Sequence, residues 1–124
     1  MVLRCLAAAS VFGALGSFLL PVQADPPTDE PTLQRGESVN YLCERGERLE
    51  ATYYALSDQS LAFVRLRLPD GRQQTLPQIA SASGARFSAD SDLTWWIKGN
   101  SGFLQQRNAQ GAWRVTLNDC DSVA

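Results

Sequence analysis

The sequence of 124 residues contains no histidine. Without histidine the chain cannot form the Ser-His or Cys-His pairs that activate nucleophiles in many hydrolytic enzymes. It also lacks the imidazole ligand of the usual zinc sites, and it has no glycine-rich loop of the kind that binds phosphate groups. We therefore expect a protein that is not an enzyme and that has neither a metal site nor a cofactor.

Lysine is almost as scarce, since Lys98 is the only one and every other basic residue is arginine. Lys98 precedes Gly99, and the small-residue segment 81–85 (SASGA) lies a short distance upstream. An ammonium is a compact, strongly hydrated charge, unlike a planar guanidinium. We interpret Ser83 and Lys98 as polar groups presented on two neighbouring loops. The alternative is a solvated strand-end charge beside a simple turn, which is what most surface charges are.

Long apolar runs are limited to one, residues 6–20. A membrane-spanning helix needs about 20 apolar residues, so this run is too short for an anchor. Arg4 precedes the run, and Val22 and Ala24 place small residues at the −3 and −1 positions of a cleavage site. Cys5 precedes the run as well, which argues against lipid attachment there. We predict a signal peptide over 1–24, cleaved after Ala24, and no membrane span in the mature chain.

Cysteine and basic runs are scarce in the mature chain. Loss of the signal peptide leaves Cys43 and Cys120, and two cysteines in an exported domain predict one disulfide rather than two thiols. It also leaves 10 basic and 13 acidic residues, a net charge of −3. A mildly acidic chain without a basic run argues against nucleic acid as a partner. Electrostatic steering instead favours a basic protein, and the sequence leaves the oligomeric state open.

Helical periodicity is absent, and short segments alternate with turns every 8–12 residues. The clearest alternation is in Leu61–Leu68, where every second residue is apolar. Pro77 predicts an edge strand or a bulge. Residues 25–36 are proline-rich and predict a flexible leader before a domain over 37–124. Strands are expected at 38–44, 49–56, 61–68, 72–79, 85–88, 93–98, 103–107 and 112–118. This pattern predicts an all-β protein, either an antiparallel sandwich or a closed barrel.

Two other features favour structural roles. Asp90 and Asp92 could bind calcium or act as acid and base, but no third ligand follows at a suitable spacing, so a turn is the better interpretation. Trp95, Trp96 and Trp113 are expected in the core and its margin rather than around a ligand. A small apolar ligand inside the barrel, in the cell envelope, remains an alternative function, although eight strands leave it little room.

The segments YLC (41–43), SASGARF (81–87), WWIKG (95–99) and LNDC (117–120) together resemble the family of membrane-bound or periplasmic inhibitors of C-type lysozyme. The resemblance covers roughly Tyr41 to Cys120. It implies a small eight-stranded antiparallel β-barrel with one disulfide, and a protein that blocks C-type lysozyme and so protects peptidoglycan. The signal peptide favours the soluble periplasmic form.

The resemblance also implies a binding site. Ser83 and Lys98 would enter the lysozyme cleft, with Gly84, Phe87 and Gly99 beside them in the same motifs. Two departures stand out: Phe87 replaces the family's usual tyrosine, and the 15 positions from Ser83 to Lys98 are one more than expected. We expect the additional residue in the 89–92 turn.

Overall fold

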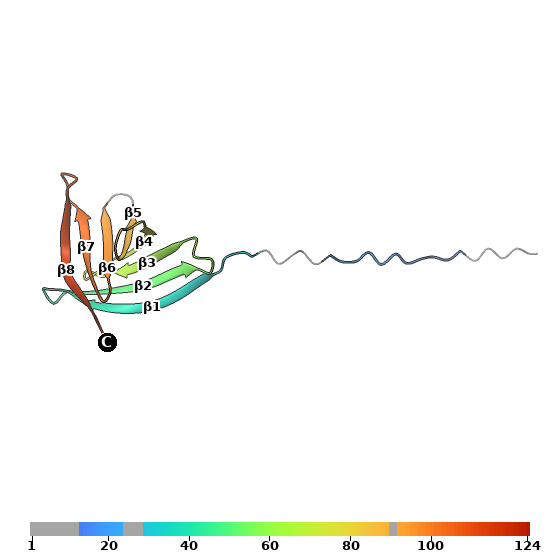
Figure 1. The fold of residues 1–124 in the computed structure, drawn as a ribbon, viewed down its shortest axis with the longest axis horizontal. Coiled ribbons are helices and arrows are strands. Elements are labelled where there is room, and N and C mark those ends of the chain that lie inside the picture. The colour runs from blue at the N-terminus through green and yellow to red at the C-terminus, as the bar shows by residue number, and fades with distance from the viewer. Residues whose placement is uncertain (1–12, 24–28, 90–91) are drawn as a thin grey trace, which may run out of the picture.

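The computed structural model describes residues 13–23, 29–89 and 92–124. Within these ranges the chain forms eight strands: β1 (Leu33–Leu42), β2 (Arg48–Leu56), β3 (Ala62–Arg67), β4 (Gln73–Ile79), β5 (Ala85–Ala89), β6 (Leu93–Lys98), β7 (Ser101–Arg107) and β8 (Trp113–Val123). Each strand pairs antiparallel with the next, and β8 pairs with β1 to close a barrel. In Figure 1, β1–β3 run roughly at right angles to β6–β8. The predicted fold class is confirmed.

The N-terminal region is described only in part. Arg4, Cys5 and the predicted cleavage site at Ala24 lie outside the described residues. In the described ranges, no helix has the length and apolar character needed to cross a membrane.

The first strand begins earlier than expected, at Leu33 instead of Ser38. Residues 33–35 pair with the end of β2, and the main chains of Thr32 and Ser57 are joined by a 2.9 Å hydrogen bond. Residues 33–36, assigned to the leader from their polar composition, therefore belong to the barrel. Backbone pairing does not require apolar side chains, so composition alone could not reveal it.

The core is filled by alternate residues of each strand, as the pattern in β3 predicts. Val64 and Leu66 are fully buried, whereas Arg65 is exposed. Trp95 occupies the centre of the barrel with no exposed surface. A Cβ on Gly102 would lie 2.8 Å from the Trp95 ring, so the indole fills space that only glycine leaves open.

Polar atoms of the core aromatics bond to one another. Trp95 Nε1 donates to Tyr53 Oη over 3.0 Å, and the Tyr53 and Tyr41 hydroxyls lie 2.9 Å apart. Burial raises the pKa of both tyrosine hydroxyls above the usual value of 10. The network satisfies groups that would be costly to bury alone.

A register shift separates two halves of β8. Leu117 pairs with Leu104 and is buried, whereas Val115 pairs with Gln105 and is 49% exposed. In a regular strand, Trp113, Val115 and Leu117 would all lie on one face. The irregularity between Leu104 and Gln105 turns the earlier residues outward, because a shift of one residue exchanges the faces of a strand.

Pro77 lies inside β4, opposite Phe63 of β3. It was expected at an edge or a bulge, and the closed barrel has no free edge strand. The pairing of β4 with β5 is confined to Gln78 and Ile79. Pro77 therefore lies beyond that short pairing, where a missing N–H is tolerated.

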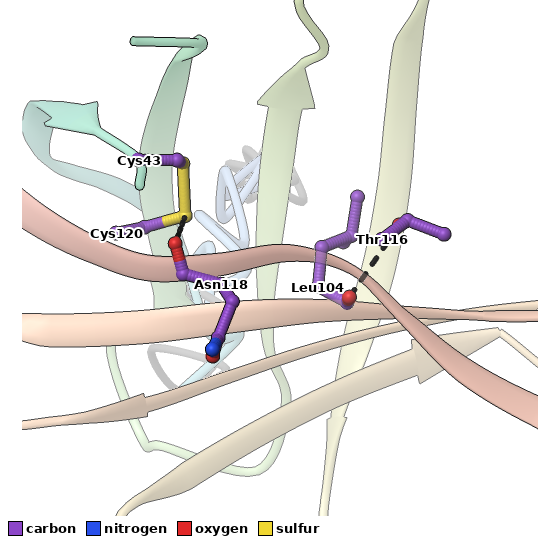
Figure 2. The surroundings of a disulfide bond; sticks show 5 residues. All are labelled: Cys43, Leu104, Thr116, Asn118 and Cys120. Carbon is purple, nitrogen blue, oxygen red and sulfur yellow. Dashed lines mark hydrogen bonds between the residues drawn. A yellow bond between two sulfur atoms is a disulfide. The ribbon is translucent and has the colours of Figure 1, made fainter. Parts of the chain in front are cut away.

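The predicted disulfide joins Cys43, which follows β1, to Cys120 in β8 (Figure 2). It lies beside the β1–β8 pairing, which has only three residue pairs. The Glu44 amide donates to the Asn118 carbonyl across the same junction, over 3.0 Å. The bond thus reinforces the place where the barrel closes.

Candidate functional site

Ser83 and Lys98 lie together at one end of the barrel. Ser83 belongs to the loop before β5, and Lys98 is the last residue of β6. The two strands are antiparallel neighbours with Ala85 opposite Ile97, so the loop and the strand end meet. Both residues are exposed, whereas Ile97 packs against the core. Lys98 therefore lies on the outer face, as expected from the alternation of side chains.

Gly84 brings the Ser83 loop against Lys98. Its φ is +65°, and a Cβ there would overlap the carbonyl oxygen of Ile97 and lie 2.7 Å from Cγ of Lys98. Only glycine accepts this close approach in this conformation. The backbone of the loop thus rests on the aliphatic stem of the lysine.

Trp96 connects the two parts of the site. Its Nε1 donates a 3.0 Å hydrogen bond to the Ser83 carbonyl, and the Ser81 hydroxyl donates to the same oxygen over 2.5 Å. The Lys98 ammonium lies 5.2 Å from the centre of the Trp96 ring, within cation–π range. One indole therefore fixes the serine loop and restrains the lysine.

Arg86 adds a second positive charge. Its Cζ lies 4.8 Å from the centre of the Trp96 ring, and its Nε is buried with no hydrogen-bond partner among the described residues. Over the same residues, Lys98 makes no ion pair within 4.0 Å, and the pair between Arg72 and Asp70 is the only one. The site thus carries two positive charges, and the described residues leave its ammonium free to meet an anionic group.

Comparison with known proteins assigns the family. Residues 41–113 match the sequence model of the membrane-bound lysozyme-inhibitor of c-type lysozyme family. The chain belongs to this family. The family is one of enzyme inhibitors, and its membrane-bound description agrees with a protein of the cell envelope.

One sequence relative and one solved structure carry the same description. A membrane-bound lysozyme inhibitor of C-type lysozyme from Yersinia enterocolitica is 37% identical over 86 residues, which cover 69% of this chain and 63% of the relative. The match therefore spans less than two thirds of the relative's length. The crystal structure of Pseudomonas aeruginosa MliC in complex with hen egg white lysozyme has a TM-score of 0.56 and 22% identity, covering 84% of this chain and 98% of that one. This second likeness shows a common fold.

Phe87 and Gly99, the other residues of the family motifs, differ in setting. Phe87 is 4% exposed and packs in the core with its ring 5.6 Å from that of Tyr53. It supports β5 from beneath and presents almost no surface. Gly99 is exposed, has φ of +58°, and forms with Asn100 the two-residue connection to β7. Glycine suits this turn because its positive φ carries no steric cost.

The sequence did not identify Trp96 or Arg86 as parts of the site. Trp96 was assigned to the core and its margin, and it is half-buried. Its position two residues before Lys98 places it on the same face of β6. That spacing is the signal that could have found it. The pairing of Arg86 with Trp96 depends on the register between β5 and β6.

A cavity of about 420 Å³ opens at the same end of the barrel. Its apolar wall comes largely from Ala55, Ala62 and Ala85, with the rings of Tyr53 and Phe87. Small side chains at these inward positions leave the end of the barrel unfilled. For metal ions, the described residues contain no group of three or more ligating side chains, and Asp90 lies outside them.

Proposed function

We propose that this protein inhibits C-type lysozyme by inserting Ser83 and Lys98 into the catalytic cleft, and that it thereby protects peptidoglycan. Family membership supports the target, as does the Pseudomonas aeruginosa relative described in complex with hen egg white lysozyme. The observation that carries the proposal is an exposed lysine whose stem rests against the Ser83 loop and whose ammonium makes no ion pair among the described residues.

The chemistry of the target explains why an ammonium would inhibit it. Lysozyme uses two carboxyl groups, and an apolar pocket keeps one of them protonated so that it can act as the acid. An ammonium between the two groups stabilises their ionised forms and lowers the pKa of the acid. The proton needed to cleave the glycosidic bond is then lost. The Ser83 hydroxyl can donate to one of the carboxylates, and both loops exclude the sugar.

Rigidity of the site favours tight binding. The ordering of loops and long side chains costs about 0.5–1.5 kcal/mol per side chain when it happens on association. Here Trp96 already binds the Ser83 carbonyl, and Gly84 already contacts the stem of Lys98. Inhibition requires no covalent step, so the protein acts by occupying the cleft and is not itself an enzyme.

The location follows from the same proposal. A signal peptide over 1–24, cleaved after Ala24, would deliver a leader and the barrel to the periplasm, where the inhibitor would meet lysozyme before it reaches the cell wall. N-terminal sequencing of the exported protein tests this. A mature chain that begins elsewhere, or that carries a lipid, would contradict it.

Substitution of the two polar residues tests the function. Lys98→Ala is expected to weaken binding by about 2–5 kcal/mol, as truncation of one member of a buried charge pair does. Ser83→Ala should cost about 1 kcal/mol. Turbidity assays of cell-wall lysis give the inhibition constants. Arg45→Ala is the control, because it removes an exposed positive charge from the β1–β2 turn. Equal inhibition by Lys98→Ala and Arg45→Ala would refute the mechanism, and no inhibition by the wild type would refute the function.

The cavity favours a second candidate function, binding of a small apolar ligand in the cell envelope. Its volume of about 420 Å³ lies within the range of ligand pockets, about 300–1,000 Å³. Titration with 8-anilinonaphthalene-1-sulfonate tests it. Ala62→Leu, which adds bulk at the wall of the cavity, should abolish the fluorescence gain that the wild type shows. No gain with the wild type would reject this candidate.

A further inference from the structure

A groove of about 240 Å³ lies on the outer surface of β6, β7 and β8, directly beside Lys98. Its lining comes from all three strands. The lining residues are Trp96, Lys98, Ser101, Gly102, Phe103, Asn118 and Asp119. Of these residues, only Lys98 is among those that the resemblance places in the lysozyme-binding site.

The floor of the groove is aromatic. Trp96 pairs with Phe103 across β6 and β7, and their ring centres lie 5.7 Å apart. Both rings are half-buried, and Lys98 already lies over the Trp96 ring, which leaves the Phe103 ring for a ligand. Such a floor suits a flat apolar or cationic group, because the face of an aromatic ring attracts positive charge.

One wall of the groove is a bulge in β8. Gly102 pairs with Cys120 and Leu104 pairs with Leu117, so Asn118 and Asp119 together face the single residue Phe103. Asp119 has φ of +46°, in the left-handed region that few residues other than glycine enter. Bulges of this kind redirect a side chain out of the regular alternation. The bulge brings a carboxylate to the edge of the aromatic floor.

The two charges of the groove remain apart. Asp119 and Lys98 both line it, yet the described residues hold no ion pair between them within 4.0 Å. Asp119 is exposed, and it forms no ion pair with any other residue that the structure describes. The groove thus offers a cation at one side, a carboxylate at the other, and aromatic rings between them.

We propose that this groove receives an arginine side chain of the protein that Lys98 contacts, with the guanidinium against Phe103 and paired with Asp119. The inference rests on the proposed function and makes that arginine a residue beside the lysozyme cleft. A guanidinium fits better than an ammonium because it is planar, stacks on aromatic rings and binds a carboxylate through two N–H groups. The net charge of −3 expected for the mature chain favours a basic partner in the same way.

The chain offers a matched pair of variants for the test. Asp119→Asn removes the carboxylate, and asparagine tolerates the left-handed backbone as well as aspartate does. Asp121→Asn removes the same charge two residues along β8, outside the groove. We expect Asp119→Asn to weaken lysozyme binding about 10-fold or more. Asp121→Asn should change it less than about 2-fold. Both are measured by surface plasmon resonance at low and at high salt.

Two further measurements separate the possible failures. N-acetylarginine amide added to the free protein should shift the NMR signals of Phe103 and Asp119 more than N-acetyllysine amide does, and Asp119→Asn should remove the difference. Equal effects of Asp119→Asn and Asp121→Asn on lysozyme binding would overturn the groove inference while leaving the proposed function intact. A wild type that binds arginine amide but not lysozyme would overturn the proposed function and, with it, the assignment of the arginine to lysozyme.

Discussion

Gly84→Ala is the substitution that most directly tests the geometry of the site. The new methyl group would overlap the Ile97 carbonyl oxygen and would lie 2.7 Å from Cγ of Lys98. The first of these neighbours is backbone in β6 and cannot move without disturbing the strand. The loop that carries Ser83 must therefore shift away from Lys98.

The free-energy cost of Gly84→Ala has two parts. A residue with a Cβ in the left-handed region costs about 1–2 kcal/mol, and the overlap adds a further cost that the loop relieves by moving. Gly111→Ala isolates the first part, because Gly111 has φ of +79° with open space around it, in the turn between β7 and β8. This turn lies at the other end of the barrel from Lys98. The loss of stability of Gly111→Ala should appear as a fall in Tm of about 4–8 °C per kcal/mol for a domain of this size.

The assay compares stability and inhibition for the two variants. Thermal unfolding followed by circular dichroism gives Tm, and the lysis assay gives the inhibition constant. We expect Gly111→Ala to lose stability but to inhibit like the wild type, whereas Gly84→Ala should lose inhibition by about 10-fold or more, corresponding to at least about 1.4 kcal/mol. Full inhibition by a folded Gly84→Ala variant would show that the contact between the serine loop and Lys98 is not needed.

Three other predictions address the parts that hold the site. Trp96→Phe keeps an aromatic ring but loses the N–H that donates to Ser83, so inhibition should weaken about 5-fold at nearly unchanged Tm, corresponding to about 1 kcal/mol; an unchanged inhibition constant would deny the indole this role. Reduction of the Cys43–Cys120 bond, which closes a 77-residue loop, should lower the free energy of unfolding by about 2–5 kcal/mol; denaturant titration with and without reductant checks this, and overlapping curves would contradict it. Burial raises the pKa of Tyr53, so the folded chain retains a proton above pH 10 that the unfolded chain loses. The free energy of unfolding should therefore keep its full value below about pH 10 and fall above it, by up to about 1.4 kcal/mol per pH unit. Tyr53→Phe should reduce that slope, and an equal slope in both proteins would assign the effect to other groups.

The alternation of apolar and polar residues along single strands predicted part of the core. The alternation in Leu61–Leu68 identified the buried face of β3 because its side chains follow a strict period of two. The expectation of export, which leaves two cysteines in the mature chain, predicted the disulfide that the structure shows. The neighbourhood of Ser83 and Lys98 also followed from sequence, since a hairpin of two adjacent strands returns the chain to its starting end.

Features that depend on pairing between strands were not predictable. The outward turn of Val115 and the left-handed Asp119 both come from irregularities between β7 and β8. Neither leaves a local signal, because a bulge is fixed by the partner strand as much as by its own residues. The hydrogen bond from Trp96 to the Ser83 carbonyl joins residues 13 positions apart and requires the observed loop conformation. Such contacts appear only once the register is known.

Register also explains how the site accommodates its unusual spacing. Pairs run without a shift from Ala85–Ile97 to Ala89–Leu93, so β5 and β6 contain no inserted residue. The additional residue expected between Ser83 and Lys98 therefore does not interrupt the pairing of β5 with β6. The relation between the serine loop and the lysine is fixed by the pairing of Ala85 with Ile97, because Ser83 lies just before Ala85 and Lys98 follows Ile97.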